Sequence, residues 1–216
     1  SDITGFYQDG REFAVVGLQN AAAFVDVTDP SNPFEVGRIN GGNSIWRDLK
    51  YWDRHVYIGT EASDGVKVVS VDNLDNPVLV NTITDFTNSH NIYIDEDGFL
   101  YVVGASSYAM WIYDLTYPSN PVLVGTWGAN DPGYSQYLHD ITVYNNKVYG
   151  ASIYEGYIYI IDVSDKSNPQ TILLNGQAYF NTGGGYISSH DTAVTPDEQY
   201  LFTGDENTGG HVKIWD

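Results

Sequence analysis

The 216-residue sequence contains no cysteine, few basic residues and no long apolar run. Without cysteine, the chain has no disulfide framework, no thiolate metal site and no cysteine nucleophile. No segment approaches the about 18 consecutive apolar residues that a membrane-spanning helix needs, so we expect no membrane insertion in this segment. The sequence also shows no signal peptide and does not begin with Met, as expected for a mature or truncated product.

The scarcity of lysine and arginine makes the chain strongly acidic. Nine basic residues stand against 28 acidic ones, which gives a formal net charge of −19. This charge repels nucleic acid and anionic membranes, so we expect neither as a partner. It suits a soluble extracellular protein, or one that holds divalent cations.

The sequence motifs of several common enzyme classes are also missing. The chain has no G-x-S-x-G elbow, no Gly-rich phosphate loop and no H-E-x-x-H helix. Acidic residues are plentiful, but their sequence spacing does not fix the separation of two carboxylates, so a glycosidase is not predicted. The sequence favours a protein without catalytic activity.

What the sequence does contain is a repeat of 43 to 51 residues. An Asp or Asn opens a short apolar strand five times, and a Gly follows near the end of the next strand; the openers are Asp2, Asp48, Asn91, Asp140 and Asp191. This period is typical of a β-propeller, in which one repeat forms one four-stranded blade. We therefore predict a single all-β domain, a β-propeller of four-stranded antiparallel blades, with repeats at about 1–45, 46–88, 89–137, 138–188 and 189–216.

The third repeat shows the pattern of one blade. Strands are predicted at 91–94, 99–104, 110–115 and 122–127, separated by turn signals. A turn rich in Asx, Ser and Pro precedes the fourth strand and recurs in the other repeats. We expect it to build turns rather than bind calcium, because Asx and Ser side chains cap their own backbone.

The fifth repeat reaches its third strand at Asp216 and shows no fourth. A propeller closes to protect the edges of its sheets. We therefore expect these repeats to be part of a larger ring, or to be completed by self-association through the open last blade.

The sequence also resembles a known family. The segments 11–37, 44–77, 89–105 and 189–216, with the strand openings WRDLK, SHN and SHD, are similar to the choice-of-anchor B proteins, whose blades resemble the LVIVD repeat. The resemblance covers essentially the whole chain. It implies an exported bacterial or archaeal surface protein and an extracellular address, but it implies no particular reaction.

Candidate ligands for a metal lie at one repeated position. His90, His139 and His190 directly precede three strand openers, and loops on the facing side of each repeat carry Glu61 and Glu206. In a propeller both sets of loops meet at the mouth of the central channel. Imidazoles with one or two carboxylates are the usual ligands of zinc, iron, copper or manganese, so these five residues predict a divalent metal site.

A structural role for the same residues remains open. A His and an Asp at the start of each first strand can lock neighbouring blades through hydrogen bonds. Arg47 occupies the equivalent position in the second repeat, where it would place a positive charge near any cation or pair with an anionic ligand. We keep Arg47, Asp48, Asn91, Asp140 and Asp191 as candidates for ligand binding at the channel mouth.

The leading functional hypothesis is an exported, non-catalytic β-propeller that serves as a cell-surface binding, adhesion or structural module, with an extracellular protein or a glycan as partner. A metal-dependent hydrolase or oxidoreductase that uses the histidine group is the first alternative. The second alternative is a subunit of an extracellular assembly. Tyrosines in Gly-rich loops, namely Tyr134, Tyr137, Tyr179 and Tyr186, are candidates for stacking on sugar rings or for protein contacts, with packing in the core or loops as the default role.

Overall fold

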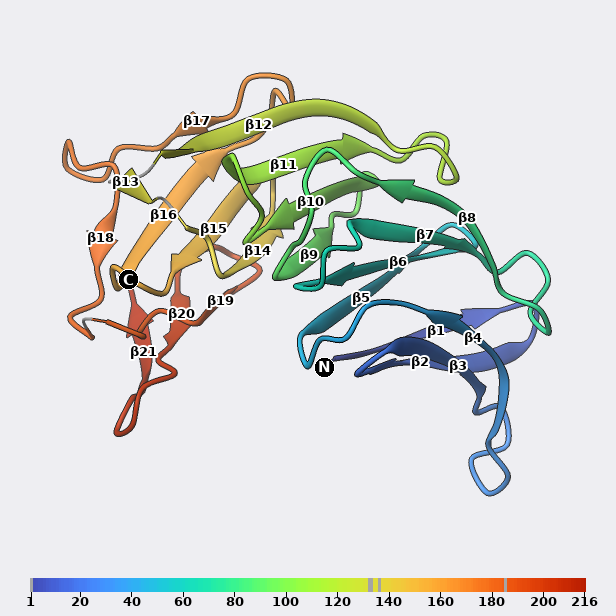
Figure 1. Ribbon diagram of the computed structural model, residues 1–216. Helices are drawn as coiled ribbons and strands as arrows, with labels where there is room; N and C mark the ends of the chain where they lie inside the picture. The colour runs from blue at the N-terminus through green and yellow to red at the C-terminus, as the bar shows by residue number, and fades with distance from the viewer. Residues whose placement is uncertain (1, 132–133, 136, 185) are drawn as a thin grey trace. The chain divides into compact units, whose positions relative to one another are not determined.

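The structure, a computed structural model, describes residues 2–131, 134–135, 137–184 and 186–216. All regular secondary structure in these residues is β, and the strands form five antiparallel sheets of three to five strands (Figure 1). The predicted all-β class is therefore confirmed. The described residues include no helix that is long and apolar enough to cross a membrane.

The first two sheets are regular four-stranded meanders. The first has the order β1-β2-β3-β4 and the second β5-β6-β7-β8. The strands are β1 (Ile3–Gln8), β2 (Arg11–Leu18), β3 (Ala21–Asp26), β4 (Phe34–Asn40), β5 (Arg47–Trp52), β6 (His55–Thr60), β7 (Val66–Ser70) and β8 (Val78–Ile83).

The third and fourth sheets depart from the expected four strands. The third has five, in the order β13-β12-β11-β10-β9; in the fourth, ordered β14-β15-β16-β17, the outer strand is interrupted, so that β18 pairs with β16 as well. The strands are β9 (Asn91–Ile94), β10 (Phe99–Val103), β11 (Tyr108–Asp114), β12 (Val122–Asp131), β13 (Tyr134–Ser135), β14 (Asp140–Tyr144), β15 (Lys147–Ser152), β16 (Tyr157–Asp162), β17 (Gln170–Thr171) and β18 (Phe180–Asn181).

The fifth sheet has three strands in the described residues. It contains β19 (Asp191–Val194), β20 (Leu201–Gly204) and β21 (Val212–Trp215), in that order. The strands of each sheet lie within one of the five repeat ranges. Each opener lies in the first strand of its sheet, except Asp2, which directly precedes β1.

The recurring acidic turns build their own backbone conformation. In the first sheet the Asp26 carboxylate accepts a hydrogen bond from the Thr28 N–H at 2.8 Å, and Asp162 and Ser164 repeat this contact at 2.9 Å in the fourth. These are the local Asx contacts that the sequence pattern predicts. The hydrogen bonds from Thr28 and Ser164 lower the pKa of both carboxyls, so they are ionised at neutral pH.

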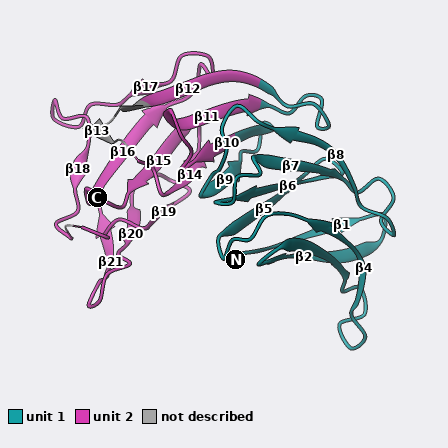
Figure 2. Cartoon of the chain, viewed as in Figure 1, with its two compact units in different colours: residues 1–100, 114–122 teal, residues 101–113, 123–216 magenta. Residues whose placement is uncertain are grey.

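The chain divides into two compact units, which are coloured separately in Figure 2. Unit 1 comprises residues 1–100 and 114–122, and unit 2 comprises residues 101–113 and 123–216. The core of unit 1 includes a stack of aromatic rings, in which Phe6 lies 5.1 Å from Phe13 and 4.5 Å from Tyr51 between ring centroids. In unit 2, Tyr149 and Leu201 belong to a smaller core cluster.

Neighbouring first strands pack closely within each unit. In unit 1, β1 lies against β5 and β5 against β9; in unit 2, β14 lies against β19. A Cβ atom on Gly59 would lie 2.9 Å from the Ser89 hydroxyl, and one on Gly204 would lie 2.4 Å from an Asp191 carboxylate oxygen. At Gly59 a larger residue would meet the buried Ser89, whereas at Gly204 the flexible and exposed Asp191 side chain would have to move.

Candidate metal centre

Two of the predicted histidines stand directly before first strands of unit 2. The His139 N–H donates to the Ala151 carbonyl at 2.8 Å, and the His190 N–H donates to the Gly204 carbonyl at 2.7 Å. Each histidine thus bonds to the residue that pairs with the following strand opener, since Asp140 pairs with Ala151 and Asp191 with Gly204. The backbone of both histidines is therefore fixed by the sheets themselves.

The structure brings these histidines together with one of the predicted glutamates. A potential ligand atom from each of His139, His190 and Glu206 lies within 4.8 Å of the other two. The two imidazole rings are 4.3 Å apart between centroids and inclined by 47°. His139 is buried, His190 is half-buried and Glu206 is exposed, so the group opens from the protein towards solvent.

A hydrogen bond sets the tautomer of His139. Its Nδ1 atom lies 2.9 Å from the His190 carbonyl oxygen, which can only accept, so Nδ1 carries the proton. In a neutral imidazole the lone pair is then on Nε2, which is the ring atom that would coordinate a metal. Donation from Nδ1 to a backbone carbonyl is a common way of orienting a metal-binding histidine.

The loop that carries His190 is fixed by buried polar contacts. Ser188 and Ser189 have no exposed surface. The Ser188 N–H donates to the Ile153 carbonyl at 3.1 Å, and the Ser189 hydroxyl lies 2.9 Å from the Thr182 hydroxyl. These contacts attach the loop to the fourth sheet and limit the movement of His190.

The carboxylate of Asp205 anchors the neighbouring loop, which carries Glu206. Lys213 Nζ lies 2.7 Å from this carboxylate, which also accepts from the Ser189 N–H at 3.3 Å. Burial alone would raise the pKa of Asp205, but the hydrogen bonds from Lys213, Ser189 and His211 outweigh burial and lower it. Asp205 thus stays ionised beside the histidine pair.

The other two predicted metal ligands form a separate pair in unit 1. His90 Nδ1 lies 2.6 Å from Glu61 Oε1. Glu61 is exposed and His90 is half-buried. A role of this pair in metal binding stays a prediction.

Arg47 links segments of unit 1. Its side chain is buried and donates to the carbonyls of Leu18, Gln19 and Gly42 at 3.0, 3.4 and 2.7 Å. Burial lowers the pKa of the guanidinium, while the nearby Asp64 acts in the opposite direction. These contacts join the first and second sheets, as the structural role of this position predicts. A ligand role for Arg47 stays a prediction.

Asp48 is a buried carboxyl that joins two first strands. One oxygen is 2.7 Å from the Leu49 N–H and 2.6 Å from Lys50 Nζ, and the other is 2.8 Å from the Ile92 N–H in β9. Burial raises the pKa of Asp48 to about 7, with a hydrogen bond to Asp2 acting in the same direction and Lys50 opposing it. Asp48 therefore titrates near neutral pH.

The remaining candidates differ in exposure. Asp140 is half-buried and accepts from the Ile141 N–H at 2.6 Å. Asn91 is half-buried, and Asp191 is exposed beside Gly204. A role of these three residues in ligand binding also stays a prediction.

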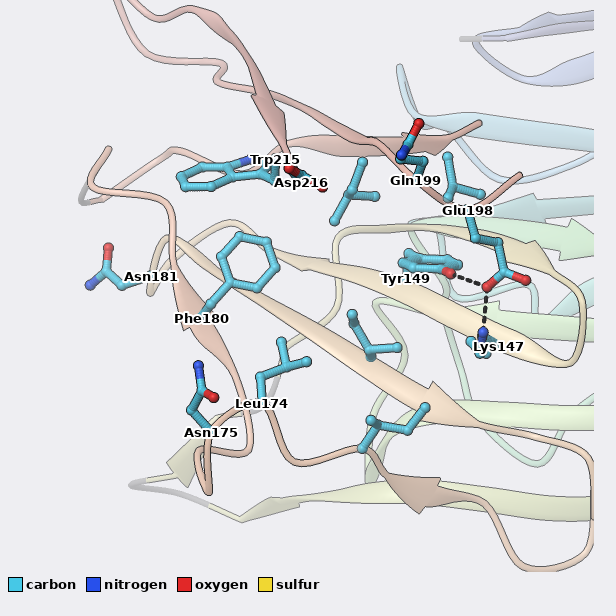
Figure 3. A pocket seen from close by; sticks show the side chains of 14 residues that line it. Lys147, Tyr149, Leu174, Asn175, Phe180, Asn181, Glu198, Gln199, Trp215 and Asp216 are labelled. Carbon is cyan, nitrogen blue, oxygen red and sulfur yellow. Dashed lines mark hydrogen bonds and ion pairs between the residues drawn. The ribbon is translucent and has the colours of Figure 1, made fainter. Parts of the chain in front are cut away.

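Unit 2 also contains a cavity of about 710 Å³ that the sequence did not predict (Figure 3). It is lined by β16, by the segment between β17 and β18 and by residues of the fifth sheet, with Phe180, Leu174 and Trp215 on its apolar side. On its polar side, Glu198 accepts hydrogen bonds from Asn145, Lys147 and Tyr149, which lower its pKa to about 2. The only signal in the sequence was the Asn-Gly turn that interrupts the fourth strand of this repeat.

Two segments of the chain, residues 12–41 and 136–173, match the model of the LVIVD repeat. No curated protein matches the sequence.

Similar solved structures cover nearly the whole chain. The β-propeller domain of Cps50 (Swd1) from Myceliophteria thermophila has a TM-score of 0.67 at 12% identity and covers 97% of this chain and 67% of its own. A functionally unknown protein from Desulfotomaculum acetoxidans has a TM-score of 0.69 at 14% identity and covers 100% of this chain and 68% of its own. A protein from Lactobacillus plantarum has a TM-score of 0.70 at 10% identity and covers 98% of this chain and 68% of its own.

At these identities the similarity shows the fold alone. The chain spans 66% to 68% of the length of five such structures. The chain is thus an all-β protein that contains LVIVD-repeat segments and has the fold of part of a larger β-propeller.

Proposed function

We propose that this protein is an exported, non-catalytic β-propeller module of the cell surface that binds a divalent transition metal ion through His139, His190 and Glu206. The observation that carries the metal site is the convergence of these three side chains within 4.8 Å. The bond from His139 Nδ1 to the His190 carbonyl supports it, because it leaves the lone pair on Nε2.

The chemistry of the ligands selects the kind of ion. Two imidazoles and one carboxylate suit zinc, copper, iron or manganese better than calcium, which takes oxygen ligands. Ligand distances of about 2.0 to 2.2 Å bring any two ligand atoms to within about 4.4 Å, so the group would contract slightly on binding. Glu206 is exposed on its loop and can make this movement, while the backbone of both histidines is fixed.

The cell-surface assignment rests on other features. The resemblance of the repeats to choice-of-anchor B proteins favours an exported surface module, and the net charge of −19 suits an extracellular protein. Accessibility of the protein to protease on intact cells tests this assignment. Protection from protease until the cells are lysed would contradict it.

Metal binding is tested by calorimetric titration with zinc, copper, manganese and ferrous iron, together with elemental analysis of the purified protein. We expect one equivalent to bind to the wild type and none to His139→Ala/His190→Ala. A His90→Ala/Glu61→Ala variant removes the equivalent groups of unit 1 and serves as the matched control. If this control also loses the metal, or if no metal binds to the wild type, the assignment of the metal site to His139, His190 and Glu206 is wrong.

The interlocking role of the histidines predicts a different result. If His139 only joins the two sheets through the His190 carbonyl, the double variant loses about 1 to 3 kcal/mol of stability, because buried partners stay unsatisfied, and there is no metal to lose. Melting curves of wild type and variant, recorded with and without added zinc, separate the two roles. If zinc raises the melting temperature of the wild type but not that of the variant, the metal site is supported.

A metal-dependent hydrolase is the second candidate. Three protein ligands leave a coordination position for water, which is the arrangement of catalytic rather than structural zinc sites. Glu206 would then serve as a ligand or as the general base. Hydrolysis of chromogenic esters and phosphate esters by the zinc-loaded protein tests this function, and activity that is absent from Glu206→Gln would favour it over the binding module.

A further inference from the structure

We infer that a row of three tyrosines beside the histidine pair of unit 2, formed by Tyr137, Tyr154 and Tyr186, is a stacking surface for a neutral glycan. This inference rests on the proposed function as a binding module, but it does not require the metal. The row lies in the same group of loops as the metal centre: Tyr137 precedes His139 by two residues, and Tyr186 precedes His190 by four.

The three rings lie in contact with one another. The ring centroids of Tyr137 and Tyr154 are 5.0 Å apart, and those of Tyr154 and Tyr186 are 5.9 Å apart with planes inclined by only 24°. Tyr154 is 47% exposed and Tyr186 is 69% exposed. Two neighbouring aromatic side chains of the row are thus largely exposed to solvent, although burial of aromatic rings is strongly favourable.

The backbone that presents Tyr186 is strained and fixed. Ile187 and Ser189 have φ angles of 56° and 57°, a conformation that is a genuine outlier for the β-branched Ile187. Ser188 and Ser189, which lie between Tyr186 and His190, are fully buried, and the Ser188 N–H donates to the carbonyl of Ile153, the residue before Tyr154. Strain that the surrounding structure maintains is concentrated at functional sites in proteins.

The packing of Tyr186 against Tyr154 depends on this loop. A Cβ atom on Gly184 would lie 2.4 Å from the Ser188 Cβ, so a side chain at position 184 would collide with the backbone-proximal part of Ser188. Close packing of Gly184 against Ser188 thus helps to hold the loop on which Tyr186 contacts the ring of Tyr154. A preorganised aromatic surface loses little conformational entropy when it binds a ligand.

The geometry and charge indicate the chemistry of the ligand. Rings in direct contact leave no space between them for a cation, so the row is not an aromatic cage for an ammonium group. The net charge of −19 disfavours nucleic acids and anionic polysaccharides. What remains is a neutral ligand with flat apolar faces and hydroxyl groups, and the spacing of the rings is comparable with the length of one pyranose residue.

Polar groups beside the row can receive the hydroxyls of a sugar. Glu155 follows Tyr154 directly and accepts a hydrogen bond from the Ser152 hydroxyl. Glu155 is half-buried, and its charge acts on the neighbouring Tyr159, whose pKa it raises together with burial, which is the larger cause. Stacking faces with a few oriented polar groups at their edge are the usual composition of a ligand site.

Binding is tested with four neutral hexasaccharides, cellohexaose, maltohexaose, mannohexaose and chitohexaose, and with polygalacturonate as the anionic probe. Saturation-transfer NMR and calorimetry measure binding to the wild type, with and without EDTA. We expect at least one neutral probe to bind, and Tyr154→Ala/Tyr186→Ala to weaken it at least about tenfold. Tyr154→Phe/Tyr186→Phe retains the rings and should retain most of the affinity.

Tyr7→Ala/Tyr117→Ala is the matched control, because these tyrosines of unit 1 are 68% and 72% exposed. It should leave binding unchanged. The inference is overturned if no neutral probe binds at millimolar concentration, if the unit 1 variant loses as much affinity as the row variant, or if only polygalacturonate binds. If the glycan binds in the presence of EDTA and the titrations show no metal binding, the metal centre is refuted but the glycan-binding role of the tyrosine row is supported.

Discussion

The buried carboxyl of Asp48 makes the stability of this protein depend on pH near neutrality. Its side chain is 8% exposed and lies against Lys50, with the Leu49 and Ile92 N–H groups as further donors. Burial nevertheless raises its pKa to about 7. We expect Asp48→Asn, which has no titratable proton, to abolish the pH dependence that this group creates.

The sign and size of the effect follow from linkage. A carboxyl with a raised pKa binds its proton more tightly in the folded chain than in the unfolded chain, so stability falls as the pH rises between the two pKa values. The folded value is about 7. With an unfolded value of about 3.9, the free energy of unfolding of the wild type, relative to Asp48→Asn, falls by roughly 2.5 kcal/mol from about pH 5 to about pH 7.5.

The assay is urea denaturation of wild type and variant at several pH values, followed by tryptophan fluorescence. The Asp64→Asn variant is the control, because the hydrogen bond from Lys67 lowers the pKa of Asp64, so its contribution is lost only in more acidic solution. The difference between wild type and Asp64→Asn should stay constant over the same range. If the difference for Asp48→Asn also varies by less than about 0.5 kcal/mol, Asp48 is ionised throughout and the argument from burial is wrong.

Two further predictions concern the scaffold. Gly125→Ala should lower the free energy of unfolding in urea denaturation by about 1 to 3 kcal/mol or more, since its Cβ would lie 1.9 Å from the Lys166 carbonyl oxygen. Gly5→Ala, whose nearest contact would be 3.5 Å, should be tolerated, and equal effects of the two substitutions would contradict the steric reasoning. The 216-residue chain should self-associate through β21, where Val212 and Ile214 are 74% and 63% exposed. In sedimentation velocity, Val212→Lys/Ile214→Lys should shift the chain to a monomer. A wild type that is monomeric at high concentration would refute this prediction.

The sequence by itself determined the all-β class, the repeat and the role of the acidic turns. These features are local or periodic: an apolar strand, an Asx turn and a chain reversal each depend on residues close in the sequence, and repetition at 43 to 51 residues indicates stacked equivalent sheets. The strand 91–94 was predicted with its observed bounds, Asn91–Ile94. The fifth strand of the third sheet and the interrupted outer strand of the fourth were not predicted, because short edge strands carry little pattern.

Only the tertiary structure decided which of the equivalent residues meet. The sequence placed His90, His139 and His190 at one repeated position, but it did not show that His139 and His190 gather with Glu206 while His90 pairs with Glu61. It did not show the tyrosine row either, because Tyr154 and Tyr186 are 32 residues apart in the sequence. Their contact depends on the path of a strained loop held by buried serines, and such long-range side-chain geometry leaves no periodic trace in a sequence.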